Sequence, residues 1–213
     1  MNKSRRMAAT QSREFSLAGY AVLQIDLLGC GDSSDDFGDA TWDGWLQDVA
    51  QGAQWLLDKV DAPLWLWGVR AGCLLASDVA RNLTEPCNFV FWAATPSGKA
   101  VWQQFTRLKA AGEMFSGNAK GVAEVLRQQL AEGLSVEVAG YRISPALAGG
   151  MERAVLDPPA SPVPDARLVW LDISTRVDPT LSPAAQRSIE LWEQAGFHVH
   201  GQCVQGPSFW QTT

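Results

Sequence analysis

The sequence predicts an α/β fold with a doubly wound, mostly parallel sheet, and three observations support this prediction. Short apolar runs alternate with segments of helical periodicity along most of the chain. A glycine-rich loop follows the first apolar run directly, and a Gly-x-x-x-Gly corner follows the second. Such loops are typical of the carboxyl ends of parallel strands, where folds of this class place their ligands.

The apolar runs are the expected strands, and the expected helices lie between them. In chain order, the expected strands are 20–26, 64–67, 88–93, 165–174 and 197–204. The expected helices are 2–18, 42–60, 71–83, 99–115, 118–132 and 183–195. Because strands and helices alternate, neighbouring strands should run parallel with helices on the sheet faces.

One stretch interrupts the alternation. Residues 97–162 hold two of the expected helices and a strand-like piece over 135–143, and a proline-rich segment then leads back to the sheet. An insertion of this kind is typical of a lid over a cavity. The alternative is that these helices pack at the sheet edge. In either case we expect a single domain over 1–213 with 97–162 as the insertion.

The composition excludes several classes of function. The chain has 213 residues, 46% of them hydrophobic, which suits one globular domain with a full core. A net charge of −6 and a pI of about 4.9 argue against nucleic-acid binding. No apolar run approaches the roughly 20 residues of a membrane span, and no apolar signal core follows the basic start. We expect no cofactor.

The cysteines give no sign of a metal site. Cys30, Cys73, Cys87 and Cys203 are far apart and show no C-x-x-C spacing. We therefore expect reduced thiols in a cytoplasmic protein, rather than disulfides or a zinc site.

The corner after the second strand carries the most informative residue. Gly68-Val69-Arg70-Ala71-Gly72 has the G-x-S-x-G frame of a nucleophile elbow, with arginine at the serine position. Gly68 and Gly72 suit a sharp strand-to-helix turn and are candidate binding residues of the site. An arginine cannot attack a carbonyl, because its guanidinium stays protonated and offers no lone pair. The frame indicates a hydrolase-type fold, whereas its apex residue lacks the usual chemistry.

The loop after the first strand adds a second motif. Residues 26–34 read Asp-Leu-Leu-Gly-Cys-Gly-Asp-Ser-Ser, which resembles the D-x-x-G-x-G-x-S signature of α/β-hydrolases. Gly29, Gly31 and Ser33 are the candidate binding residues of this loop, because its glycines permit a tight turn at the carboxyl end of the strand.

A more specific resemblance covers most of the chain. The start at residues 1–7, the segments 19–22, 28–34, 37–42 and 64–72, and the ending 206–210 resemble the exosortase A system-associated hydrolases of ortholog group 2. The resemblance implies a bacterial cytoplasmic protein linked to extracellular-polysaccharide synthesis and PEP-CTERM protein sorting, nominally an ester or thioester hydrolase. It also implies that arginine at the elbow is a feature of the group.

The resemblance assigns the other triad positions. Asp178, after the strand over 165–174, falls at the acid position, although it could instead cap the following helix. Ser208 falls at the histidine position. The chain has 2 histidines, His198 and His200, which alternate along the last strand and are better read as strand residues than as a displaced base.

Two hypotheses follow for the apex. We expect Arg70 either to pair with Asp178 or to hold a small anionic or acyl ligand, because a guanidinium beside backbone N–H groups forms an anion site. The alternative is that it turns outward to solvent. Cys30, Ser33 and Cys73 are weaker candidates for a substitute nucleophile. The chain is thus either an impaired hydrolase or a non-catalytic binding scaffold.

The resemblance also implies strands before the first helix and a helix after Trp210 that this sequence does not contain. A fragment or a misassigned start would explain this. Without those strands, the sheet should expose an edge.

Overall fold

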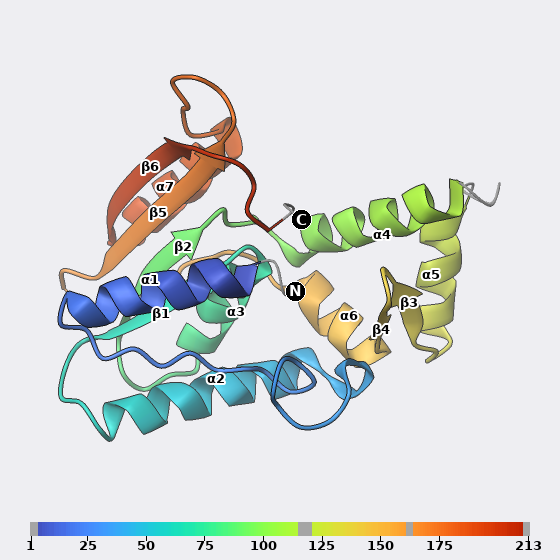
Figure 1. Ribbon diagram of the computed structural model, residues 1–213, viewed down its shortest axis with the longest axis horizontal. Coiled ribbons are helices and arrows are strands. Elements are labelled where there is room, and N and C mark those ends of the chain that lie inside the picture. The colour runs from blue at the N-terminus through green and yellow to red at the C-terminus, as the bar shows by residue number, and fades with distance from the viewer. Residues whose placement is uncertain (1–3, 115–120, 161–163, 211–213) are drawn as a thin grey trace.

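A parallel sheet forms the centre of the computed structural model, which describes residues 4–114, 121–160 and 164–210 (Figure 1). Every neighbouring pair of its strands is parallel. In spatial order the strands are β1 (Leu64–Val69), β2 (Cys87–Trp92), β5 (Arg167–Ser174) and β6 (His198–Gln205). Four of the five predicted strands and the α/β fold class are therefore confirmed.

One face of the sheet carries the main core. Phe89 and Phe91 of β2 are fully buried and contact the ring of Trp192 at centroid distances of 4.9 and 5.3 Å. Trp192 belongs to α7 (Pro183–Gln194), and α3 (Ala71–Ala80) packs beside it against β1 and β2. Alternation along each strand sends these rings to one side, as expected for a strand buried between layers.

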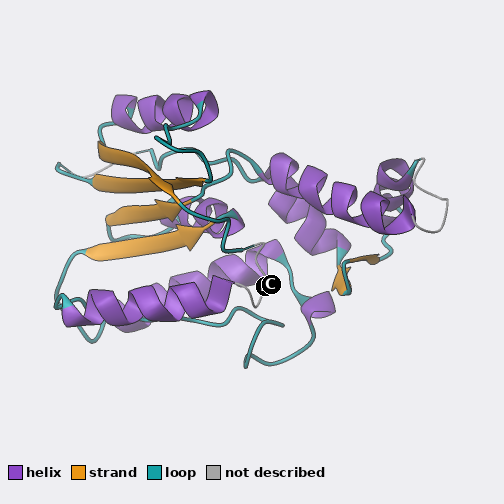
Figure 2. Ribbon diagram, turned by 45° about the horizontal axis from the view of Figure 1, so that its top comes forward, coloured by secondary structure: helices purple, strands orange, loops and turns teal. Residues whose placement is uncertain are grey.

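The opposite face is covered only in part. The helix α1 (Arg5–Leu17) lies over it, where Phe15 contacts Trp67 at a centroid distance of 5.5 Å. The helix buries none of its residues fully. On the α3 side of the sheet, α2 (Trp42–Leu57) packs against α3, and its N-cap is Thr41, whose hydroxyl accepts a hydrogen bond from Gly44 N. Figure 2 shows the resulting layers of helix and sheet.

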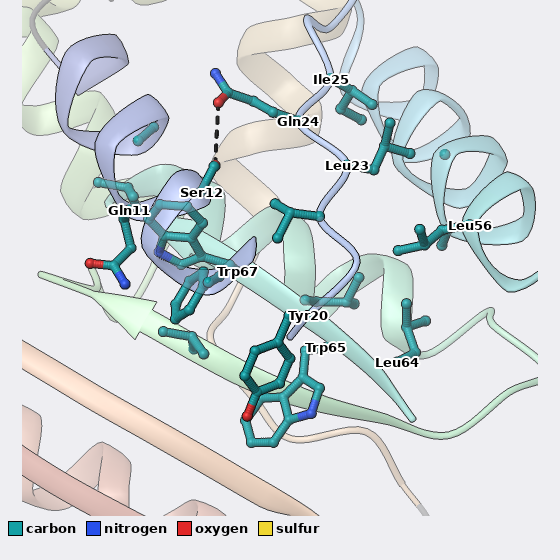
Figure 3. A pocket seen from close by; sticks show the side chains of 18 of the residues that line it. Gln11, Ser12, Tyr20, Leu23, Gln24, Ile25, Leu56, Leu64, Trp65 and Trp67 are labelled. Carbon is teal, nitrogen blue, oxygen red and sulfur yellow. Dashed lines mark hydrogen bonds between the residues drawn. The ribbon is translucent and has the colours of Figure 1, made fainter. Parts of the chain in front are cut away.

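The first predicted strand, 20–26, does not form. These residues are extended but belong to no sheet, and residues 21–25 are exposed. A strand needs a hydrogen-bonding neighbour, and the sheet ends at β1, from which a cavity separates this segment (Figure 3). The apolar run therefore predicted the extended backbone correctly, but the prediction that it pairs within the sheet was wrong.

The insertion lies beyond the carboxyl ends of the strands, toward which the arrowheads point in Figure 2. The expected helices are confirmed as α4 and α5, and the strand-like piece is a hairpin. Residues 115–120 and 161–163 of this stretch lie outside the described residues. The elements are α4 (Gly98–Met114), α5 (Val122–Ala131), β3 (Val136–Val138), β4 (Tyr141–Ile143) and α6 (Pro145–Arg153).

The sequence analysis did not predict two short helices, α6 and η2. The helix α6 begins at Ser144, whose hydroxyl accepts a hydrogen bond from Leu147 N, with Pro145 in its first turn. This Ser-Pro pair is a helix-start signal present in the sequence. The 3-10 helix η2 (Phe37–Asp39) closes the loop before α2. No described helix is both long and apolar enough to cross a membrane.

Candidate functional site

Arg70 stands at the corner between β1 and α3, as the sequence predicted. Its backbone has φ 56° and ψ −120°, a conformation that glycine adopts readily and other residues rarely. Its N–H donates to Trp92 O at 2.9 Å, which fastens the corner to the end of β2. A strained apex between strand and helix is the geometry of a nucleophile elbow. The α/β fold thus places Arg70 at the strand-to-helix corner that the G-x-S-x-G frame predicted.

The two elbow glycines differ in what they do. A Cβ atom on Gly68 would lie 2.6 Å from the backbone of Cys73, so only glycine lets the strand and helix approach this closely. A Cβ atom on Gly72 would meet nothing within 4 Å. The steric requirement therefore holds for Gly68 and not for Gly72.

The Arg70 side chain ties together three parts of the fold. Its guanidinium donates one hydrogen bond to Ala93 O (3.1 Å), just after β2, and another to Gln104 Oε1 (2.8 Å) on α4. Its central carbon lies 5.0 Å from the ring centre of Trp210, a cation–π distance. The side chain is half-buried. The alternative in which Arg70 points freely into solvent is therefore wrong.

Asp172, near the end of β5, is the carboxylate that acts electrostatically on Arg70. Burial raises the pKa of Asp172, while the neighbouring Arg70 acts in the opposite direction. Burial also lowers the pKa of Arg70, and Cys73 and Asp172 counter that effect. Because arginine starts from so high a value, the guanidinium stays charged at neutral pH.

Asp178 and Ser208 lie differently with respect to the elbow. Asp178 is exposed in the loop after β5, with φ 54°, and no ion pair joins it to Arg70 among the described residues. The Arg70–Asp178 pair that we expected is therefore absent. Ser208 is half-buried beside Phe209, whose ring contacts Trp92 at 6.0 Å. The structure thus brings the Ser208 segment, and not Asp178, toward the elbow.

The glycine-rich loop is held by α1 and α2. The Asp26 carboxylate accepts a hydrogen bond from Asp32 N at 3.0 Å and pairs with Arg5. A Cβ atom on Gly31 would lie 2.3 Å from that carboxylate, and one on Gly29 would lie 2.6 Å from Asp36 O. Both glycines are required by this tight loop.

Among the described residues, no hydrogen bond or ion pair joins this loop to the elbow. Trp45 Nε1 donates to Leu28 O at 3.0 Å, and Leu28 N donates to Asp48 at 2.8 Å, so both anchors lie on α2. Ser33 is half-buried, and its N–H donates to Cys30 O. A binding role for Gly29, Gly31 and Ser33 stays a prediction.

The substitute nucleophiles lack the environment that they would need. Burial raises the pKa of the Cys73 thiol far above its ordinary value, and Cys73 is fully buried. Burial also raises the pKa of Cys30, and the Asp26 carboxylate adds to this effect. A nucleophilic cysteine needs a lowered pKa. Both histidines lie on β6, where their side chains are exposed.

Sequence reasoning missed Gln104, Asp172 and Trp210 as neighbours of Arg70. Asp172 carried a weak signal, as a charged residue inside an apolar run. Gln104 carried none, because its contact with Arg70 spans 34 positions and depends on how α4 docks. Among the described residues, no group of three or more acidic, histidine or cysteine side chains could hold a metal ion.

Comparisons with known proteins find similarity only at the level of structure. No family model and no curated protein matches the sequence. The similar solved structures include RedJ, a thioesterase from the prodiginine biosynthetic pathway in Streptomyces coelicolor (18% identity over 89% of this chain and 69% of that chain, TM-score 0.47). They also include Rv0554 from Mycobacterium tuberculosis (16% identity over 91% of this chain and 74% of that chain, TM-score 0.49). A variant of PytH is similar as well (17% identity over 92% of this chain and 81% of that chain, TM-score 0.46). Similarity at this level transfers no activity to this chain.

Proposed function

We propose that this chain is a non-catalytic protein on a hydrolase-type fold, which binds an anionic group at Arg70 instead of hydrolysing an ester or thioester. The observation that carries this proposal is the position of Arg70 at the apex, in the strained backbone conformation of an attacking residue. A guanidinium there has no lone pair with which to attack.

Among the described residues, the elbow also lacks the histidine base of a hydrolase triad. A hydroxyl or thiol needs a neighbouring base to become a nucleophile. Ser208 stands where the resemblance places the histidine, and His198 and His200 lie exposed on β6. Asp178, at the expected acid position, has no hydrogen bond or ion pair to a histidine among the described residues.

The guanidinium has capacity left for a ligand. Arginine carries five N–H donors, and two hydrogen bonds from the Arg70 side chain are recorded in the described part of the chain. The N-terminus of α3 adds its partial positive charge at the same corner. A planar carboxylate or a phosphate, such as the head of an acyl ligand, suits this arrangement.

The resemblance to the exosortase A system-associated group supports a cellular setting for this function. A bacterial cytoplasmic protein of the polysaccharide and PEP-CTERM sorting system would then recruit an acyl or anionic intermediate, or a partner, without turning it over. The insertion over 97–162 would act as a lid, since Gln104 on α4 already contacts Arg70.

Turnover and binding measurements on the purified chain test this proposal. We expect the hydrolysis of p-nitrophenyl butyrate and butyryl-coenzyme A to stay at the uncatalysed rate. We expect isothermal titration calorimetry to detect binding of butyrate or inorganic phosphate. We expect Arg70→Met to weaken that binding about tenfold or more, because it removes a charge-assisted hydrogen bond. Arg187→Met, on the exposed face of α7, is the matched control.

The enzyme hypothesis predicts the opposite pattern. Turnover by the unmodified chain that disappears in Cys30→Ala or Ser33→Ala would establish a substitute nucleophile and refute the proposal. Equal binding by the Arg70→Met and Arg187→Met variants would also refute it, because the anion would then bind elsewhere.

A further inference from the structure

The side-chain amide of Gln104 is oriented by Arg70. Its Oε1 accepts a hydrogen bond from the guanidinium at 2.8 Å. Because a guanidinium carries only N–H donors, the amide can meet it only through its oxygen. The NH2 group of Gln104 makes no hydrogen bond within the described part of the chain, and the side chain is exposed. The N–H donors of this amide therefore stay available beside a charged group.

Arg70 itself keeps donors for a ligand. Ala93 O and Gln104 Oε1 each accept one hydrogen bond from its guanidinium, which leaves three of the five N–H donors of an arginine. An incoming oxygen can bind to these donors without displacing Gln104. The amide oxygen and a ligand oxygen are thus compatible on the same guanidinium.

The groups that act electrostatically on Arg70 do not cancel its charge. Asp172 is one of them, but no ion pair joins it to Arg70 among the described residues. Cys73 is the other, and burial raises the pKa of its thiol, which therefore stays neutral. The positive charge of the guanidinium is left for a ligand.

From these observations we propose that Gln104 is a second binding residue of the Arg70 site, whose amide N–H groups donate to an oxyanion that the guanidinium holds. The ligand is then an oxyanion with more than one free oxygen, because one oxygen meets the guanidinium and another meets the amide. This inference rests on the proposed function, since it requires that Arg70 binds an anion.

A ligand in this position also connects the insertion to the elbow. The helix α4 packs mainly against α5, α6 and β3 of the same insertion, and Figure 1 shows it running from the carboxyl edge of the sheet out to α5. The hydrogen bond between Gln104 and Arg70 joins α4 to the corner after β1. An oxyanion bound by both side chains adds a second connection, so ligand binding should restrain α4.

Calorimetric titration with inorganic phosphate tests the role of the amide. Gln104→Met keeps a side chain of similar length and helix preference but removes the amide. We expect this variant to bind phosphate about tenfold more weakly than the parent, because a hydrogen bond to a charged ligand is lost. The matched control is Gln103→Met, because Gln103 is also exposed on α4 and its side chain makes no hydrogen bond among the described residues.

Amide hydrogen exchange separates ligand binding from a merely structural role. We expect phosphate to slow exchange in α4 of the parent and of Gln103→Met, and to leave exchange in α4 of Gln104→Met unchanged. If Gln104 served only to dock α4, its substitution would speed exchange in α4, and phosphate would have no effect on that exchange in the parent.

Two further results would overturn this inference and leave the proposed function intact. Equal phosphate binding by Gln104→Met and Gln103→Met, with binding by Arg70→Met weakened, would show that the amide does not contact the ligand. Tighter binding by Gln104→Met, with faster exchange in α4 when phosphate is added to the parent, would show that the amide competes with the ligand. Phosphate binding that Arg70→Met leaves unchanged would instead refute the proposed function, and this inference with it.

Discussion

The guanidinium of Arg70 lies 5.0 Å from the ring centre of Trp210, so the last described residue of the chain packs over the elbow. This contact joins the corner after β1 to the segment after β6, two parts that lie 140 positions apart in the sequence. Since the Gln104 side chain accepts a hydrogen bond from the same guanidinium, Arg70 acts as a structural link at the site.

Loss of the Trp210 ring should destabilise the fold modestly. We expect Trp210→Ala to lower the free energy of unfolding by about 0.5–2 kcal/mol, the range of a cation–π contact plus some lost burial, while Trp210→Phe retains most of it. Urea denaturation measures the effect. The exposed Trp55→Ala serves as control and should change stability by less than about 0.5 kcal/mol. Equal losses in Trp210→Ala and Trp55→Ala would contradict the contact.

The backbone strain at Arg70 predicts an unusual order of variants. Arg70→Ala and Arg70→Gly both remove the side-chain hydrogen bonds, but glycine accepts φ 56° and ψ −120° without strain. We expect Arg70→Gly to be more stable than Arg70→Ala by about 1 kcal/mol, measured by chemical denaturation. In an ordinary helix the order is reversed, and that reversed order would show that the apex is not strained.

The two elbow glycines should respond in opposite directions to a methyl group. Gly68→Ala forces a Cβ atom against the Cys73 backbone, so we expect a loss of about 2 kcal/mol or more, or failure to fold. Gly72→Ala lies in the open first turn of α3 and should stabilise the chain by about 0.5–1 kcal/mol. Thermal melting of the two variants compares them directly.

The raised pKa of Asp172 predicts a pH-dependent effect of its substitution. In the unfolded chain the group titrates near about 4, and burial raises its pKa in the folded chain. The stability provided by protonated Asp172 is therefore present below the unfolded value and is lost as the pH rises through the folded value. We expect Asp172→Asn to gain stability relative to the parent between about pH 4 and pH 7.

Denaturation of both proteins across that pH range measures this difference. The exposed Asp178→Asn variant controls for the loss of one negative charge. A difference between Asp172→Asn and the parent that shrinks as the pH rises would contradict the assignment.

Thiol labelling should separate the cysteines by burial. Cys73 and Cys87 are buried, and burial raises the pKa of Cys87 to about 12, so both should react with Ellman's reagent only after unfolding. Cys30 and Cys203 are half-buried and should react slowly in the folded protein, because burial raises the pKa of each. Rapid labelling of Cys73 would instead reveal an activated thiol at the elbow.

Local patterns determined most of the fold. Apolar periodicity located four strands of the sheet, and the spacing of Gly68 and Gly72 placed Arg70 at a strand-to-helix corner, which the structure confirms. These features depend on neighbouring residues, whose steric and hydrophobic preferences act over a few positions.

Only the tertiary structure determined which distant residues contact one another. The run over 20–26 became an unpaired segment because pairing depends on which strand lies beside it, not on its own residues. Arg70 bonded to Gln104 and Ala93 instead of Asp178 because long side chains reach whatever the packing of distant elements brings near. The sequence thus determined where the elbow stands, and long-range packing determined what its arginine touches.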